Sequence, residues 1–152
     1  MNRITSLCAA LTLMSAIGVA GQAPAPGSAI FIHPDGAGVA AWSAARLLAV
    51  GPDGTLAWDR LERMGVYRGH MSNSLGASSH GGATTHAFGV KVPFDSYGLR
   101  GADRLISLSG KPYSILLEAK EAGLATALIN SGHIAEPGTG VFAASAASRS
   151  EI

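Results

Sequence analysis

Residues 78–91 read SSHGGATTHAFGVK, and the interpretation of the whole chain starts from this stretch. Hydroxyl side chains followed by small residues and then by an Ala-Thr-Thr-His-Ala-Phe run predict a loop that turns into a helix. The first N–H groups of a helix lack intrahelical partners and carry partial positive charge, which favours phosphate-like anions. A serine at that point is placed as a nucleophile beside an anion site would be. A serine that only caps an ordinary helix is the more common arrangement, so this stretch taken alone does not establish a nucleophile.

The composition of the chain is that of a globular protein with little charge. Its 152 residues are enough for one domain with a hydrophobic core. Abundant Ala and Gly with 14% charged residues favour a buried α/β architecture over disorder or a coiled coil. Basic and acidic side chains nearly balance, and no basic run is present, which argues against specific binding of nucleic acid.

Residues 1–23 are predicted to be a signal peptide. Arg3 is followed by a mostly apolar segment that ends in small residues, with plausible cleavage after Ala20 or Ala23. Hydroxyl residues within the apolar segment make it short for a membrane span. Cys8 is the only cysteine, so the mature chain would form no disulfide. We therefore expect a periplasmic or secreted protein with no membrane attachment after cleavage.

The remaining chain alternates apolar runs with helical patterns. A Pro- and Ala-rich linker is expected over residues 24–28, and residues 29–152 form the main region. Strands are predicted over residues 29–32 and 124–129, with a weaker one over 66–71, and an irregular excursion over 93–109. Helices are predicted over residues 39–50, 58–64 and 113–122, the last ended by Gly123.

Polar side chains gather near the predicted element boundaries at three places. These are Asp35, the pair Ser78 and Ser79, and the pair His133 and Glu136. Carboxylates near a serine at an anion site are what a divalent metal needs to activate an oxygen nucleophile and hold phosphate. Taken singly, the aspartate is typical of a turn, the histidine of a loop and the glutamate of a solvated surface. The spacing alone leaves a metal site as a hypothesis.

Four blocks of the sequence, in order, resemble the alkaline phosphatase family. FIHPDGAG (31–38) resembles the strand and Asp-Gly opening of that family, usually close to FIGDGMG. SSHGGATTHAFGVK (78–91) is similar to its nucleophile segment, DSAATATA followed by two residues and TGVK. SILLEAKEAGLATA (114–127) resembles the helix that comes next in the family, and residues 134–149 are similar to a segment that ends in Ser-Arg. The resemblance implies an α/β three-layer sandwich with a mostly parallel central sheet, of which residues 29–152 would be the N-terminal part.

The resemblance also implies roles for individual residues. Counting back from the closing Gly-Val-Lys places Ser79 on the nucleophile, with Ser78 the less favoured choice. Asp35 falls on the aspartate that bridges magnesium and one zinc, and Glu136 on a threonine that binds magnesium. Arg149 matches the arginine that clamps two phosphate oxygens. The implied activity is hydrolysis of small phosphate monoesters through a seryl-phosphate, with two zinc ions and one magnesium ion, in an enzyme that commonly forms homodimers.

Several positions depart from the family pattern. Ser78 stands where an aspartate normally precedes the nucleophile, and the other departures are His33-Pro34, His80, Gly81-Gly82 and Ile134. They leave the metal identity, the choice between the two serines, and any metal role of His80 or His133 open. In the family, most zinc ligands come from segments that follow the four blocks matched here. We therefore expect a truncated fragment with little activity alone.

Two alternatives remain open from the sequence. A phosphodiesterase or phosphonate hydrolase of the same superfamily often uses a threonine nucleophile, which here would be Thr84 or Thr85. A non-catalytic secreted fragment that binds anions or a partner would form no phosphoenzyme at all.

Overall fold

The computed structural model describes residues 27–147 and Glu151. The expected signal peptide over residues 1–23, most of the linker over 24–28, and Arg149 lie outside the described residues. The chain divides into two units, residues 1–31 and residues 32–152, and the helices and strands of the described residues lie in the second. No described helix is long and apolar enough to cross a membrane.

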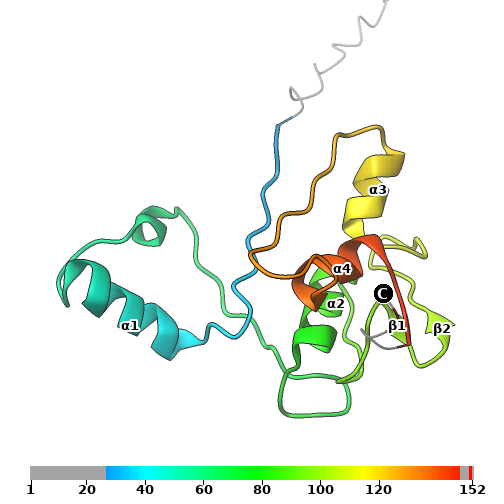
Figure 1. The fold of residues 1–152 in the computed structure, drawn as a ribbon, viewed down its shortest axis with the longest axis horizontal. Coiled ribbons are helices and arrows are strands. Elements are labelled where there is room, and N and C mark those ends of the chain that lie inside the picture. Colours follow the sequence, from blue (N-terminus) through cyan, green and yellow to red (C-terminus); the bar gives the residue numbers. More distant parts are fainter. Residues whose placement is uncertain (1–26, 148–150, 152) are drawn as a thin grey trace, which may run out of the picture. The chain divides into compact units, whose positions relative to one another are not determined.

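The second unit consists of short helices and one small hairpin (Figure 1). The antiparallel strands of the hairpin pair Leu99 with Arg104 and Arg100 with Asp103. Gly101, with φ of 62°, leads the two-residue turn between them, a position that favours glycine. In chain order the elements are α1 (Val39–Val50), the 3₁₀ helix η1 (Ala57–Arg60), α2 (Ser79–Phe88), β1 (Leu99–Arg100), β2 (Asp103–Arg104), α3 (Ile115–Glu121) and α4 (Pro137–Ala143).

The expected transition from loop to helix after Ala77 is confirmed by α2. Ser78 is its N-cap, with extended backbone and a side-chain oxygen that accepts the N–H of Gly81 at 2.9 Å. Gly89 ends the helix in the left-handed conformation at φ 71°, and its N–H donates to the carbonyl of Thr85 at 2.8 Å. Both ends of α2 are therefore set by residue types, a capping serine and a left-handed glycine, that the sequence itself shows.

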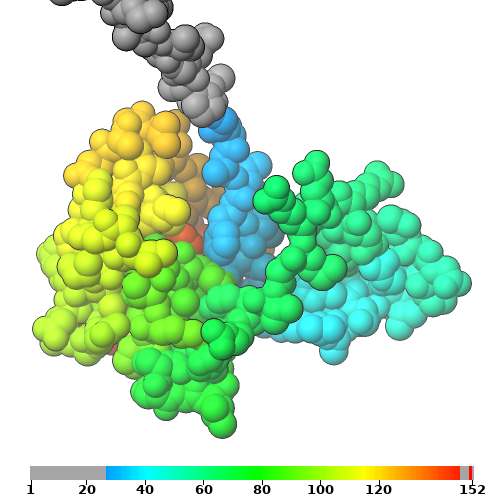
Figure 2. Space-filling view, turned by 180° about the vertical axis from the view of Figure 1, so that it is seen from behind, coloured from blue at the N-terminus to red at the C-terminus, as the bar shows by residue number. Residues whose placement is uncertain are grey.

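The core lies where α2, α4 and α3 pack together. α2 contacts both other helices, and Figure 2 shows the yellow residues of α3 and the yellow-green residues before them against the green residues of α2. Tyr97 is fully buried at the centre, and its hydroxyl donates to the carbonyl of Ala135 at 2.7 Å. The buried apolar residues of this core are Ala83, Ala87, Phe88, Val92, Tyr97, Leu105, Val141 and Phe142.

Helix α3 confirms a prediction, whereas α4 was not predicted. Ser114 caps α3 by accepting the N–H of Leu117 at 3.3 Å, and its buried hydroxyl donates to the carbonyl of Phe142 in α4. Gly123, at φ 81°, comes after the helix as expected. α4 begins with Pro137 at its first position, where a missing N–H costs nothing. Proline and two glycines within this segment are not typical of a helix, so the sequence did not predict α4.

The predicted strands are wrong for all three segments, because none of them belongs to a sheet in the described residues. Apolar side chains in two of them are open to solvent, with Ile30 86% and Ile129 90% exposed. A strand is stabilised by a neighbour's backbone and side chains, and the described part of the chain supplies no ladder to these segments. The expected three-layer sandwich is therefore not seen in these residues.

The helix predicted over residues 39–50 is confirmed by α1, but the one over 58–64 shortens to η1. The backbone turns extended at Leu61, with φ −67° and ψ 132°. Asp59 holds the short turn together, because its carboxylate accepts the N–H of Leu56 at 2.7 Å and pairs with Arg46 of α1 at 2.5 Å. Trp42 packs edge-on against Trp58 at 4.6 Å.

Candidate active site

Two of the predicted site residues meet at the start of α2. Ser79 is the first residue of the helix, and its hydroxyl donates to Oδ1 of Asp35 at 3.0 Å. Asp35 sits in a turn in which the N–H of Ala37 donates to the carbonyl of Pro34 at 3.2 Å. Gly36 holds the left-handed position of this turn at φ 73°. The structure thus joins a carboxylate and a hydroxyl that are 44 positions apart in the sequence.

The two neighbouring serines have different surroundings. Both polar functions of Ser78 go to backbone groups, since its oxygen accepts from Gly81 and its hydroxyl donates to the carbonyl of Phe94. The hydroxyl of Ser79 instead faces the exposed side chain of Asp35. On geometry, Ser78 performs the capping role and Ser79 has the hydroxyl that a substrate can reach.

Thr84, one of the two threonines that a threonine-nucleophile mechanism could use, is enclosed. Its side chain is fully buried, donates to the carbonyl of Ser96 at 2.9 Å and accepts the N–H of Gly98 at 3.0 Å. A substrate could reach this oxygen only if the packing of α2 against that loop opened.

Of the two glycines that depart from the family pattern, Gly81 and Gly82, only one is required by packing. A β-carbon at Gly81 would lie 2.4 Å from Sδ of Met71 and 2.9 Å from the carbonyl oxygen of Pro93. At Gly82 a β-carbon would meet nothing within 4 Å. The first glycine therefore allows the loop to pack against α2, and the second is not required by packing.

Two histidines that sequence reasoning did not pair are in contact beside the Asp35–Ser79 contact, one of them on α2 and the other just before Asp35. Nδ1 of His33 is 3.1 Å from Nδ1 of His86, and the rings meet edge to face at 5.1 Å. The ring of Tyr67 lies 4.9 Å from that of His86. Burial lowers the pKa of His86, with a smaller contribution from the neighbouring His33, and burial raises the pKa of Tyr67. The sequence could have placed only His86, which is seven residues after Ser79 and thus on the same helix face. No local signal indicates its contact with His33.

Comparison with known proteins assigns the chain. A family model described as alkaline phosphatase matches residues 28–151. The chain belongs to the alkaline phosphatase family. No curated protein and no solved structure matches significantly. Membership confirms the resemblance seen in the four sequence blocks, implies an α/β fold, and points to hydrolysis of phosphoesters by a family that typically binds metals.

In this alkaline phosphatase family chain, the other predicted metal ligand lies at the start of α4. Glu136 is the N-cap residue of α4, and its carbonyl accepts the N–H groups of Thr139 and Gly140 at 3.0 and 2.8 Å. In residues 27–147 and 151, no three His, Cys, Asp or Glu side chains gather closely enough to hold a metal ion. The carboxylates suit a hard cation chemically, but these residues assemble only part of a ligand set.

The two histidines whose metal role was left open have other surroundings. Nδ1 of His133 accepts the N–H of Ala135 at 3.2 Å, which orders the loop before α4. His80 lies with its ring 6.1 Å from that of Tyr97. Neither contact involves Asp35 or Ser79.

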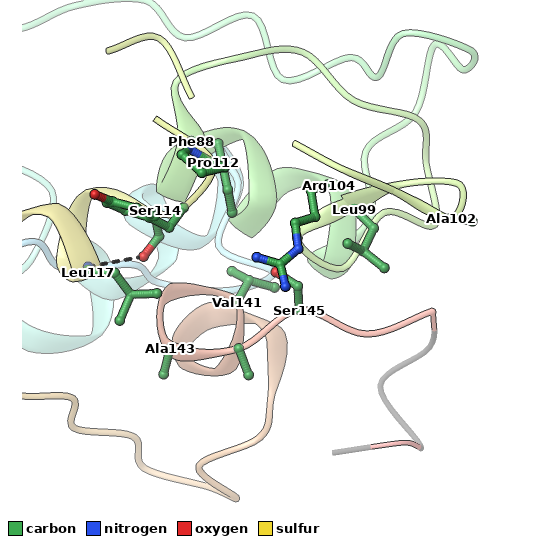
Figure 3. Close-up of a pocket in the computed structure, with 13 residues that line it drawn as sticks. Phe88, Leu99, Ala102, Arg104, Pro112, Ser114, Leu117, Val141, Ala143 and Ser145 are labelled. Atoms are coloured by element: carbon green, nitrogen blue, oxygen red, sulfur yellow. Dashed lines mark hydrogen bonds between the residues drawn. The ribbon is translucent and has the colours of Figure 1, made fainter. Parts of the chain in front are cut away.

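A hollow of about 490 Å³ in the alkaline phosphatase family chain lies away from the Asp35–Ser79 contact. It is formed where α2, α3 and α4 approach the hairpin, and neither residue of that contact lines it. In Figure 3 the side chain of Arg104 extends toward Val141 and Ser145 across this hollow. This hollow is therefore not the place where we expect chemistry.

Proposed function

We propose that this chain carries the nucleophile of a metal-dependent phosphomonoesterase that works through a phosphoserine at Ser79. The observation that supports the proposal is the 3.0 Å hydrogen bond from Ser79 to Asp35 at the beginning of α2. Family membership supplies the reaction class. The alternative in the same superfamily uses Thr84 or Thr85 as nucleophile. Thr84 is disfavoured because its hydroxyl is buried and bonded to backbone on both sides. Thr85 is half-buried, and the position of the trapped phosphate decides its case.

The chain's own groups can orient the first step. The bond between Ser79 Oγ and phosphorus forms as the bond from phosphorus to the ester oxygen breaks, and the serine proton ends on the departing alcohol. Asp35 holds the serine oxygen in one direction, and N–H groups of the first turn of α2 favour the phosphate. Water then attacks the phosphoserine, which releases inorganic phosphate and restores the serine. Arg149, which lies outside the described residues, is the proposed clamp for two phosphate oxygens.

We also propose Asp35 and Glu136 as ligands in the family's metal centre, with two zinc ions and one magnesium ion in the complete enzyme. Such ions would supply Lewis-acid stabilisation of the charge that develops on the reacting oxygens. Support comes from carboxylate chemistry and from family membership, since the described residues provide part of the ligand set. A three-layer sandwich with a mostly parallel sheet, export after removal of residues 1–23, and a homodimer are further proposals of the same kind.

Trapping the phosphoenzyme tests the proposed nucleophile. The chain is incubated with p-nitrophenyl phosphate, Zn²⁺ and Mg²⁺, quenched in acid, digested, and the phosphate is located by mass spectrometry that separates Ser78 from Ser79. We expect phosphate on Ser79 and its loss in Ser79→Ala. Ser74→Ala is the matched control, because Ser74 lies in the loop before α2 and bonds only locally, to the N–H of Gly76.

Other outcomes would overturn the proposal in different ways. Phosphate on Thr84 or Thr85 would support a phosphodiesterase-like or phosphonate hydrolase-like mechanism. Absence of any phosphoenzyme, both in this chain and in a longer protein that adds the family's remaining metal ligands, would support the non-catalytic alternative.

A further inference from the structure

His33 and His86 are hydrogen-bonded through their Nδ1 atoms, at a separation that would also suit a clamp of two nitrogens bound to one metal ion. Zinc binds imidazole nitrogen at about 2.0–2.1 Å, so two nitrogens in tetrahedral positions lie about 3.3 Å apart. The Nδ1 atoms are 3.1 Å apart and face each other. We propose that His33 and His86 together bind a late first-row divalent ion such as Zn²⁺ through these atoms, at a site that excludes the carboxylates of Asp35 and Glu136.

The surroundings hold the two rings in place for such an ion. His86 projects from α2, and the tilted ring of Tyr67 packs at 4.9 Å against it. On the other side, a β-carbon at position 138 would lie 3.0 Å from Cδ2 of His33, so Gly138 leaves room for that ring beside α4. Both histidines are half-buried, which limits their alternative rotamers. Fixed rings lower the cost of bringing two ligands to one ion.

Ligand chemistry selects the class of ion. Imidazole nitrogen suits zinc, cobalt, nickel and copper, whereas magnesium and calcium prefer carboxylate, carbonyl and water oxygen. Two protein ligands leave the remaining coordination positions to water or to a third group, so the clamp binds more weakly than a closed four-ligand site.

The clamp would also have a mechanical consequence. His33 is two residues before Asp35, and His86 is seven residues after Ser79, so the two contacts join the same segment to the same face of α2. An ion held by the histidines would fasten the segment that carries Asp35 to the helix that carries Ser79.

Metal titration of the full chain tests the clamp without reference to catalysis. Co²⁺ serves as a spectroscopic probe through its visible absorption, and Zn²⁺ binding is measured by calorimetry. We expect one equivalent to bind, and His33→Ala and His86→Ala each to weaken the affinity at least tenfold, since even loss of an outer-shell partner costs about 10–100-fold. His70→Ala should bind like the wild type, because His70 is solvent-exposed and absent from the pair.

A measurement on the unmodified chain covers the case in which a variant fails to fold. In protein labelled with ¹⁵N-histidine, Zn²⁺ should change the Nδ1 resonances of two of the five histidines, and these should be His33 and His86. Zinc-induced shifts at other histidines, no shifts, or equal affinity in folded His33→Ala or His86→Ala would overturn the clamp. The phosphoserine experiment reads Ser79, so either proposal can fail while the other stands.

Discussion

Adjacent glycines in α2 should respond to the same substitution with opposite sign. Gly81 and Gly82 are both helical, but only the first is enclosed. A β-carbon at Gly81 would meet Sδ of Met71 at 2.4 Å and two backbone carbonyl oxygens, of Pro93 and Phe94, at 2.9 and 3.0 Å. The methionine can move, whereas the carbonyls belong to a loop that also bonds Ser78. Gly82 has open space where its β-carbon would lie.

The magnitudes come from two opposing effects. Replacing glycine by alanine inside a helix stabilises it by about 0.5–1 kcal/mol, because alanine loses less backbone entropy on folding. Overpacking typically costs about 1–3 kcal/mol. We therefore expect Gly82→Ala to stabilise the chain by about 0.5–1 kcal/mol and Gly81→Ala to destabilise it by about 0.5–2 kcal/mol.

Urea unfolding followed by far-UV circular dichroism, with amide hydrogen exchange in α2 as the local probe, measures both variants. With an m-value of about 1.5 kcal/mol per molar urea, a gap of about 2 kcal/mol separates the two midpoints by about 1.3 M. The packing argument is refuted if Gly81→Ala is as stable as Gly82→Ala, or if Gly82→Ala is less stable than the wild type.

Two further predictions concern side chains outside the candidate site. The Arg46 hydrogen bonds hold the pKa of Asp59 at about 2, below its usual 3.8, so the contact stabilises fully above about pH 4 and is lost as the pH falls toward about 2. An NMR titration of the carboxyl should show this midpoint, and a midpoint near the usual value would contradict the ion pair. Ser114→Ala removes both the cap of α3 and the bond to Phe142, and should cost about 1–3 kcal/mol in urea unfolding. As a control, Ser43 is exposed in α1, and Ser43→Ala should change the free energy of unfolding by less than about 0.5 kcal/mol. Equal effects of Ser114→Ala and Ser43→Ala would show that the buried bond to Phe142 does not stabilise the chain.

Helices α1, α2 and α3 could be predicted from the sequence because their signals are local. Apolar spacing marked α1, and Ser78 and Gly89 bound α2 at its two ends. Strands depend on distant neighbours, and residues 29–32 and 124–129 have apolar composition without a ladder in the described structure. An apolar run therefore indicates a segment suited to burial, but it does not show which segment it would pair with to form a sheet.

The candidate site was predictable in part. The contact between Asp35 and Ser79 joins two blocks that the family resemblance had already placed in one site, although no local rule gives their proximity. The histidine pair was missed because His33 and His86 are 53 positions apart and, although both lie in blocks that resemble the family, the resemblance gives neither of them a role. Glu136, expected near the same metal, is the N-cap residue of α4.

Helix α1 has no buried residue, which affects how the chain should melt. A helix of 12 residues is marginal by itself in water, so α1 depends on its contacts with η1. The only two tryptophans of the chain, Trp42 and Trp58, are part of those contacts. Tryptophan emission would therefore report the opening of this region rather than the unfolding of the core around Tyr97.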